Sequence, residues 1–384
     1  MNVSASLNDF SYELFSNIIQ TNPTSDVFVS PASLFTCLAM IMVGARNHTF
    51  DQLLKGLKLK DFVESQSLKT AELHVKLRQL IEELNANPNV RLSNMILVNE
   101  GLTSRDPNVF ESYKTKVKNA YAADVRDVKF ATEGEGIKST VNDWAKEATN
   151  GLIDPFMTEA PNAQTLMMLL NALYFKGKWK YSFNENYTED RPFIDIDGQM
   201  KNVKMMRVDE KLPYARINMA GRSVHTVKVP YIHNTSMLLF IPTEADGLAA
   251  IQSHANFKEE LAKAVASLRT TDLTVHLSLP RFEMQTEYDL NPLLEKMGLG
   301  ELFGSGADFS GIVEGMSVSN VKQKAALKVN EEGTEAAVVT PFIFKLSLYL
   351  FPEDVWVTAD CPFLFAIQDD KSKTILFLGA KYNP

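Results

Sequence analysis

The sequence predicts an α+β protein of one compact domain, and three features of the chain indicate this class. Helical patterns dominate the first third, strand patterns dominate the rest, and the two kinds of element are interleaved irregularly. The repeated βαβ units of a doubly wound parallel sheet are missing from this order. No internal repeat, low-complexity tract or flexible linker divides the 384 residues. We therefore expect a single domain over residues 1–384.

The predicted helices follow from apolar residues that recur at steps of three and four. At the N-terminus Leu7, Phe10, Leu14 and Ile18 fall on one stripe, without the basic and apolar segments of a secretory signal. Further helical patterns cover residues 31–43, 66–84 and 138–148. No apolar run approaches the roughly 20 residues of a membrane span. We expect a soluble chain, cytoplasmic or secreted without a cleavable signal peptide.

The predicted strands are apolar runs or alternations bounded by Pro, Gly, Asn or charged residues. They cover residues 167–175, 224–229, 236–241 and 274–279. In the last of these, His276 alternates with Val275 and Leu277, so we expect a surface histidine there instead of a general base. A turn is predicted near residues 85–89 and a Gly/Ser-rich loop near 304–311.

Composition excludes several function classes. Hydrophobic residues make up 45% of the chain and charged residues 22%, as in a globular protein with a sizeable core. The net charge of -8 opposes long-range attraction to nucleic acid, so no nucleic-acid partner is expected. No membrane partner is expected either, because the sequence has no apolar run long enough to span a bilayer. Lys176, Lys178 and Lys180 surround Trp179, which fits an anion site or, as we favour, a solvated strand end. Cys37 and Cys361 are expected to be buried thiols in a reducing compartment.

Motifs of catalysis are missing from the sequence. None of the six histidines belongs to an HExxH pattern or stands beside cysteine in metal-ligand spacing. The sequence has neither a GxSxG nucleophile elbow nor a GxxxxGK[ST] phosphate loop. We therefore expect no metal, no cofactor and no enzyme activity.

A series of segments in a fixed order carries a family resemblance. The first, DVFVSPASLFTCLAMIMVGARNHTFDQ from Asp26, contains the landmarks Ser30, Pro31, Ser33, Gly44, Ala45, Thr49 and Gln52. It is followed by VNDWAKEATNGLI, NALYFKGKW, LPRFEMQTEYDL, ADFSGI, ADCPFLFAI and the terminal ILFLGAKYNP. Together they resemble the serpin family of serine protease inhibitors over essentially the whole chain. The short N-terminus and the final Asn383-Pro384 resemble its intracellular, ovalbumin-like subgroup.

The resemblance implies both a fold and a mechanism. The fold is a single domain with a large mixed central sheet, additional sheets, about nine helices and an exposed reactive centre loop within residues 331–351. The loop begins at a hinge with the sequence Glu331, Glu332, Gly333, Thr334, Glu335, Ala336 and Ala337. A protease that attacks the loop would be held as an acyl complex when the loop inserts into the sheet as a strand.

The hinge sequence suits such a strand. Gly333 provides backbone freedom at the bend, and the face that would enter the sheet begins with Thr334 and is small at first. Its members are Thr334, Ala336, Val338, Thr340 and Phe342. Glu335 falls on the opposite face and can remain in water. Pro341 departs from this pattern because it lacks the N–H that a strand ladder requires.

The resemblance also implies residues that control sheet opening. Ser30, Ser33 and Asn171 match a polar cluster beneath the sheet, the shutter, and Trp179 matches the region called the breach. Gln323 stands where the family usually has a histidine, so this cluster lacks an imidazole that could respond to pH.

The scissile bond is not fixed by alignment. Counting fourteen residues from Gly333 gives Ser347 followed by Leu348, whereas counting back eleven from Pro362 gives Phe351. We favour the first count, which makes Leu346, Ser347 and Leu348 the candidates. Because large apolar residues surround them, the expected partner is a chymotrypsin-like or elastase-like serine protease, with Lys345 as a trypsin-like alternative.

The leading prediction is a monomeric suicide-substrate inhibitor. The alternative is a non-inhibitory serpin with a carrier, chaperone or storage role, which Pro341 and Gln323 would favour.

Overall fold

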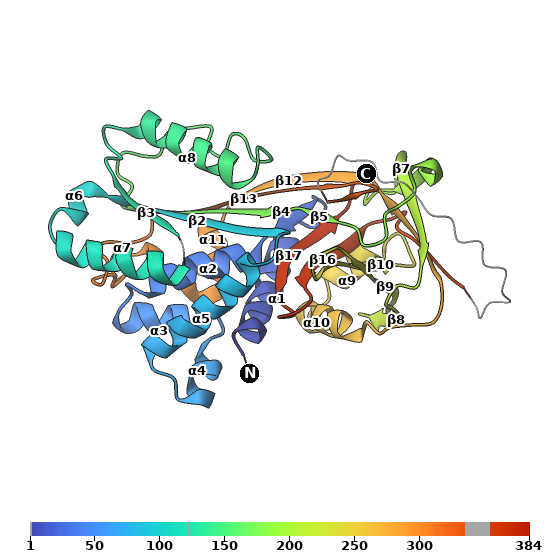
Figure 1. Cartoon of the computed structure of the whole chain (residues 1–384), viewed down its shortest axis with the longest axis horizontal. Coiled ribbons are helices and arrows are strands. Elements are labelled where there is room, and N and C mark those ends of the chain that lie inside the picture. Colours follow the sequence, from blue (N-terminus) through green and yellow to red (C-terminus); the bar gives the residue numbers. More distant parts are fainter. Residues whose placement is uncertain (1, 122, 335–353) are drawn as a thin grey trace.

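The computed structural model describes residues 2–121, 123–334 and 354–384 (Figure 1). Its helices are α1 (Val3–Thr21), α2 (Pro31–Met42), α3 (Asn47–Gly56), α4 (Lys60–Gln66), α5 (Thr70–Asn85), α6 (Glu100–Thr103), α7 (Pro107–Tyr121), α8 (Gly134–Ala148), α9 (Gly247–Gln252), α10 (Phe257–Ser267) and α11 (Asn291–Leu294). Three further helical turns are η1 (Glu185–Tyr187), η2 (Glu295–Leu299) and η3 (Gly300–Phe303). The described part thus has eleven α-helical segments instead of about nine, because single turns such as α6 leave no periodic signal in the sequence.

The strands form three sheets. The seven-stranded central sheet has the order β3 (Asp124–Val128), β2 (Val90–Asn99), β4 (Met167–Phe175), β13 (Asn320–Val329), β14 (Gly333–Thr334) and β5 (Gly177–Lys178), with β12 (Phe282–Asp289) on β13. A six-stranded sheet has the order β1 (Val27–Val29), β17 (Ile375–Lys381), β16 (Phe363–Asp369), β10 (Thr235–Pro242), β9 (Arg222–Pro230) and β8 (Tyr214–Met219). A four-stranded sheet has the order β15 (Val355–Thr358), β11 (Val275–Pro280), β7 (Met200–Glu210) and β6 (Glu189–Ile194). Parallel and antiparallel pairs occur together, which confirms the predicted α+β class with a mixed central sheet.

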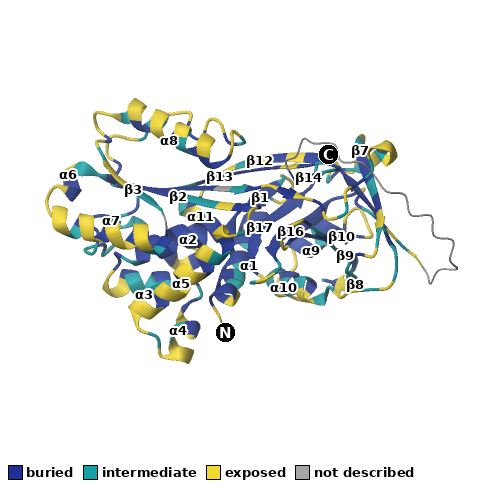
Figure 2. Cartoon of the chain, in the orientation of Figure 1, coloured by how far each residue is buried: buried dark blue, intermediate teal, exposed yellow. Residues whose placement is uncertain are grey.

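The central sheet lies between two helical layers. Helix α8 covers one face, and α2 with the other N-terminal helices lies on the opposite face (Figures 1 and 2). The alternation along β4 follows from this, because Met168 and Leu170 join a cluster with Ile137 of α8. Met167 and Leu169 point the other way and belong to the main core. Both faces of β4 are therefore buried.

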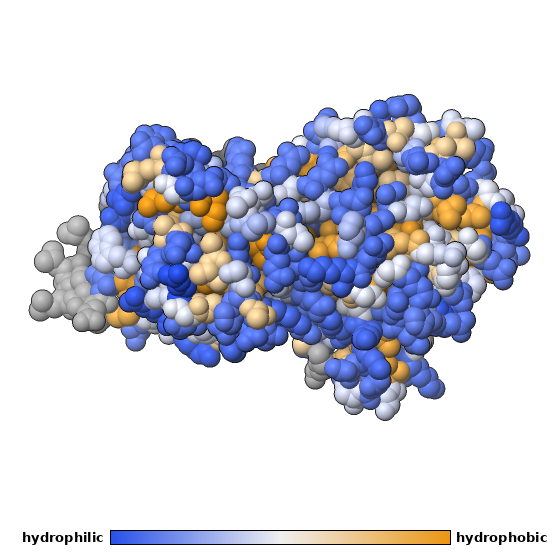
Figure 3. Space-filling view, turned by 180° about the vertical axis from the view of Figure 1, so that it is seen from behind, coloured by the Kyte–Doolittle hydropathy of each residue, from blue (hydrophilic) through white to orange (hydrophobic). Residues whose placement is uncertain are grey.

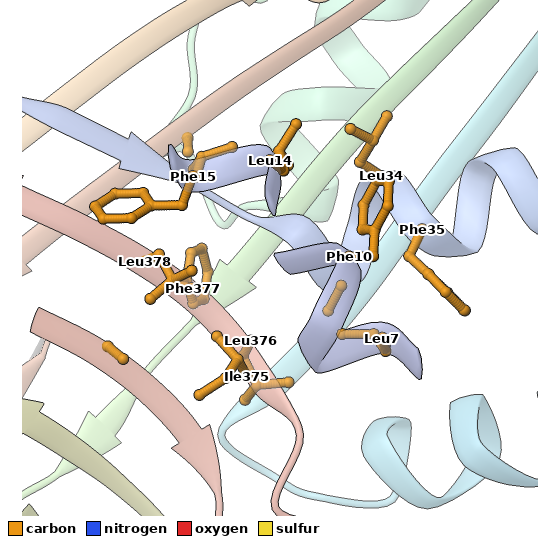
Figure 4. Close-up of a cluster of buried hydrophobic side chains, with 14 of the residues drawn as sticks. Leu7, Phe10, Leu14, Phe15, Leu34, Phe35, Ile375, Leu376, Phe377 and Leu378 are labelled. Atoms are coloured by element: carbon orange, nitrogen blue, oxygen red, sulfur yellow. The ribbon is translucent and has the colours of Figure 1, made fainter. Parts of the chain in front are cut away.

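The main core is built on helix α1 (Figure 4). The predicted stripe is confirmed, since Leu7, Phe10, Leu14 and Ile18 are all at most 2% exposed. Helix α1 packs against α2 and β17, and the Phe10 and Phe35 rings meet edge to face with their centroids 5.8 Å apart. Burial of this stripe, worth about 2 kcal/mol per large apolar side chain, fixes α1 beneath the sheets.

Two expectations about local structure have different outcomes. The strands predicted from apolar runs are confirmed within two residues by β4, β9, β10 and β11. The helix predicted over residues 66–84 is confirmed as α5 from residue 70 on, but it begins four residues later than predicted, because Ser67 adopts a left-handed conformation with φ 51° and separates α4 from α5. Apolar periodicity continues across this break, so periodicity alone cannot locate it.

The surface is mostly polar. In the view from behind, hydrophilic residues dominate and apolar ones are scattered among them (Figure 3). Lys176, Lys178 and Lys180 are exposed at and beside β5, as expected for a solvated strand end. Cys37 and Cys361 are both free and buried, as predicted. Within the described ranges, no helix is both long enough and apolar enough to span a bilayer.

Candidate functional site

The central strands β4 and β13 are only partly paired. Their parallel ladder runs from Asn320 opposite Met168 to Lys324 opposite Ala172. β4 continues for three residues beyond that point and β13 for five, without further pairs between them in the described part. Instead, β14 pairs with β13 at Val329 and with β5 at Lys178. The sheet therefore has an unfilled position between β4 and β13, which begins at β14.

A polar row crosses the sheet where β4 and β13 begin to separate. The register places Asn94 of β2 opposite Asn171 of β4, and Asn171 opposite Gln323 of β13. All three are buried, on the face toward α2. A row of three amides inside an apolar layer is costly unless its members are hydrogen-bonded.

Gln323 holds one end of the row to the start of α2. Its Oε1 accepts a hydrogen bond from the Ser30 N–H at 2.8 Å, and its Nε2 donates to the Ser30 carbonyl at 2.9 Å. The Ser30 hydroxyl also caps α2 by accepting from the Ser33 N–H. Ser33 in turn donates to Asn94 at 3.3 Å. The start of α2 is thereby bound to β13 and to β2.

Asn171 lies between Asn94 and Gln323, and its side-chain amide lacks well-formed hydrogen bonds to described residues. It is 0% exposed, and neither its Oδ1 nor its Nδ2 has a hydrogen-bond partner of good geometry among the described residues. The thiol of Cys37 on α2 lies beside it and is a weak donor. Burial raises the pKa of that thiol to about 12, and the Asn171 amide opposes the rise. A buried primary amide in this state has unused capacity for a further polar group.

Tyr231 and Trp179 contact the chain next to β14, at the end of the unfilled position away from the polar row. The Trp179 indole stacks on the Tyr231 ring at 4.1 Å and donates to the Asn330 carbonyl at 2.9 Å. The Tyr231 hydroxyl lies 2.8 Å from the Thr334 hydroxyl, and Thr334 is 1% exposed. Next to it, a Cβ at Gly333 would overlap the carbonyl oxygen of Gly177, so only glycine allows β14 and β5 to approach this closely.

The carboxylate of Glu331 is also buried here. It accepts hydrogen bonds from Arg281 Nε at 2.6 Å and from the Thr188 hydroxyl at 2.5 Å, with its side chain only 3% exposed. The Glu331 carbonyl accepts from the Phe183 N–H at 2.9 Å. These bonds fix the chain immediately before β14.

Comparison with known proteins gives a consistent result. The family model described as Serpin (serine protease inhibitor) matches residues 5–384. The chain is 32% identical to the leukocyte elastase inhibitor of Sus scrofa, over 100% of this chain and 99% of that protein. It is also 31% identical to iripin-8 of Ixodes ricinus, over 94% of this chain and 90% of that protein.

The chain belongs to the serpin family. Among solved structures, uncleaved ovalbumin superposes with a TM-score of 0.83 at 25% identity, covering 100% of both chains. A complex of thyroxine-binding globulin with thyroxine also gives 0.83 at 25% identity, covering 99% of both chains. The predicted family and fold are confirmed, and these relatives are in keeping with the ovalbumin-like subgroup.

The structure brings the residues assigned to the shutter to one place and Trp179 to another. Ser30, Ser33, Asn171 and Gln323 meet beneath the junction of β4 and β13, whereas Trp179 contacts the chain next to the hinge. Of the hinge, Glu331, Glu332, Gly333 and Thr334 are described. The rest of the hinge, Pro341 and the candidate scissile residues Leu346, Ser347 and Leu348 lie outside the described residues.

Sequence reasoning assigned no role to four residues of this site. Asn94, Tyr231, Arg281 and Thr188 make direct contacts at the shutter or the hinge. Asn94 is the polar residue on the face of β2 that otherwise carries Val90, Leu92, Ile96 and Val98, which is a signal that could have been used. Arg281 belongs to a segment that carries the family resemblance, but no local pattern in the sequence connects it, Thr188 or Tyr231 to the hinge. Across the described part, no group of three or more His, Cys, Asp or Glu could hold a metal ion.

Proposed function

We propose that this serpin is a suicide-substrate inhibitor of a chymotrypsin-like or elastase-like serine protease. The observation that carries the proposal is the unfilled position between β4 and β13, with β14 at its entrance. The apolar run around Leu346, Ser347 and Leu348 and the leukocyte elastase inhibitors among the relatives support this target class.

The chemistry begins as ordinary proteolysis. The protease serine attacks a loop carbonyl and its Oγ forms an ester bond, while the peptide C–N bond breaks and the leaving nitrogen takes up a proton. The new N-terminus stays on the C-terminal side of the loop, which continues into β15. The acylated side, which begins at the hinge, is then free to enter the sheet with the protease attached.

The register of β14 predicts how the loop would enter. Thr334 pairs with Val329 on β13 and with Gly177 on β5, so continuing both ladders antiparallel places Thr340 between Gln323 and Asn171. Thr340 shares the inward parity of Thr334 and would bring a hydroxyl to the unsatisfied Asn171 amide. The polar row Asn94, Asn171 and Gln323 would thereby gain a fourth member.

Pro341 would interrupt the ladder at a defined place. Gly333 and Asn330 form a hydrogen-bonded pair, since the Asn330 N–H donates to the Gly333 carbonyl at 2.9 Å. Hydrogen-bonded pairs alternate along an antiparallel ladder, so Pro341 would occupy such a pair opposite Lys322. One bond of about 1 kcal/mol would be lost there. A loop inserted only as far as Thr340 would still form every hydrogen bond of the ladder with β13.

A matched pair of loop variants tests the proposal. Ala336→Arg places a charge on the face that would be buried opposite Leu327, whereas Glu335→Arg places the same charge on the other face. With chymotrypsin or an elastase, we expect wild type and Glu335→Arg to give a denaturant-resistant complex. Ala336→Arg should be cleaved without complex formation. Equal complex yields for the two variants would contradict insertion in this register.

A carrier role is the second candidate, and one observation favours it. A cavity of about 730 Å³ lies between α1, α10 and the six-stranded sheet. Its lining includes Tyr12, Leu238, Lys228 and Arg269, a mixture of apolar and cationic groups that suits a small organic anion. Three outcomes together would favour this role over inhibition. The loop would be cleaved without a protease complex, cleavage would not raise the thermal stability, and the protein would retain such an anion.

A further inference from the structure

An exposed tryptophan lies on the strand that follows the reactive centre loop. Trp356 is on β15, the edge strand of the four-stranded sheet, and it is 62% exposed. Burying an indole at an interface contributes strongly to binding, and tryptophan is enriched among the residues that dominate interface energies. An indole exposed to this extent needs a physical explanation.

Polar neighbours hold this indole in one orientation. The His276 ring stacks on it with centroids 4.1 Å apart and planes at 16°, and the Arg207 guanidinium lies 4.8 Å from its centroid. Asp209 fixes both of these neighbours. It accepts a hydrogen bond from Arg207 Nε at 2.9 Å and lies 2.8 Å from His276 Nδ1. Asp354 lies 3.4 Å from the other nitrogen of His276.

This arrangement reduces the entropy cost of binding through Trp356. A side chain already held in one rotamer loses little freedom when a partner covers it, and an ordered aromatic group needs few dihedrals to be fixed. The guanidinium of Arg207 is paired with Asp209, and His276 lies between Asp209 and Asp354. The surface therefore presents an exposed apolar ring beside a paired cation. It suits a partner with an apolar depression.

The position of Trp356 favours the target protease as the partner. It is nine residues after Ser347, so the two are at most about 30 Å apart along the chain. A domain of roughly 200 residues is about 40 Å across. A protease bound at the candidate scissile bond is therefore large enough to reach the surface around Trp356.

We propose that Trp356, supported by His276 and Arg207, is a docking site for the body of the target protease, outside its substrate cleft. This site rests on the proposed inhibitory function and would act before any bond is broken. It would raise the affinity of the first, noncovalent complex and leave loop insertion unchanged.

The test separates docking from acylation by using a protease whose catalytic serine is replaced by alanine. Full-length wild type, Trp356→Ala and Trp356→Phe are titrated with this inactive chymotrypsin or elastase. Val75→Ala is the control, because Val75 is 53% exposed on α5, which lies among the N-terminal helices and away from β7 (Figure 1). Trp356→Phe keeps an aromatic ring on His276 and controls for loosening of β15.

We expect Trp356→Ala to weaken binding about tenfold or more and to slow inhibition of the active protease by the same factor. Trp356→Phe should lower the affinity for the protease only a few-fold, and Val75→Ala should leave it unchanged. The yield of covalent complex should be the same for all variants. Binding of Trp356→Ala within about twofold of wild type would overturn the docking site alone. The docking site alone would also be overturned if Trp356→Ala changed only the self-association of this protein, or only the yield of covalent complex, and not the affinity for the inactive protease. Failure of wild type to bind either protease would overturn both the docking site and the inhibitory function.

Discussion

Removing the hydroxyl of Thr340 tests the predicted end of insertion. In the inserted state this hydroxyl would lie between Asn171 and Gln323, whereas in the intact protein Asn171 is buried without a well-formed hydrogen bond among the described residues. Thr340→Val keeps the side-chain shape and removes the polar group. We therefore expect it to destabilise the loop-cleaved form and to leave the intact form nearly unchanged.

The magnitude follows from the burial of Asn171. One buried hydrogen bond contributes about 1 kcal/mol, and leaving a buried amide unsatisfied costs about 1–3 kcal/mol, so a loss of about 2 kcal/mol is expected. A chain of 384 residues unfolds with an entropy of roughly 0.8 kcal/mol per kelvin. The expected shift of the cleaved form is then about 2–3 °C.

The assay is denaturant or thermal unfolding of intact and loop-cleaved protein, for both wild type and Thr340→Val. Adding Asn171→Ala and the double variant gives a coupling free energy, which should be about 1 kcal/mol in the cleaved form and near zero in the intact form. Equal effects of Thr340→Val on both forms, or no coupling in the cleaved form, would refute this register.

Three further predictions concern other parts of the molecule. Burial lowers the pKa of His74 from 6.5 to about 4, so the unfolded chain binds more protons between these values and stability should fall by about 3 kcal/mol as pH drops through them. His74→Gln, which can still bond to Tyr121, should remove most of that pH dependence in unfolding measured from pH 7 to 4, and an unchanged slope would refute it. Arg281→Ala leaves the buried Glu331 carboxylate with Thr188 as its hydrogen-bond partner among the described residues and should lower the free energy of unfolding by about 2 kcal/mol, whereas a loss below 0.5 kcal/mol in chemical denaturation would show that the pair is unimportant. Pro341→Ala restores an N–H opposite Lys322, worth about 1 kcal/mol, and should bring the number of inhibitor molecules consumed per protease closer to one, while a higher number would contradict the predicted ladder.

Much of the fold was predictable because local patterns record it directly. The stripe on α1 and the apolar runs of β4 and β10 reflect burial that each segment carries in its own residues. The break at Ser67 was not predictable, since the residues on both sides keep helical periodicity and a left-handed serine carries no strong signal.

The site was predictable only where the family resemblance named its residues. Ser30 and Gln323 are 293 positions apart in the sequence, and their two hydrogen bonds depend on how α2 lies beneath β13. The row from Asn94 to Gln323 is a property of strand register, which a single sequence does not specify across distant strands. The same holds for Arg281 at Glu331, because nothing local to residue 281 indicates a buried carboxylate.

A crystal structure of the protein after cleavage within the loop tests the central claim most directly. The account predicts a new strand between β4 and β13, antiparallel to both, with Thr340 between Asn171 and Gln323 and the ladder weakened at Pro341. A cleaved structure in which Lys324 still pairs with Ala172, as it does in the intact protein, would contradict it.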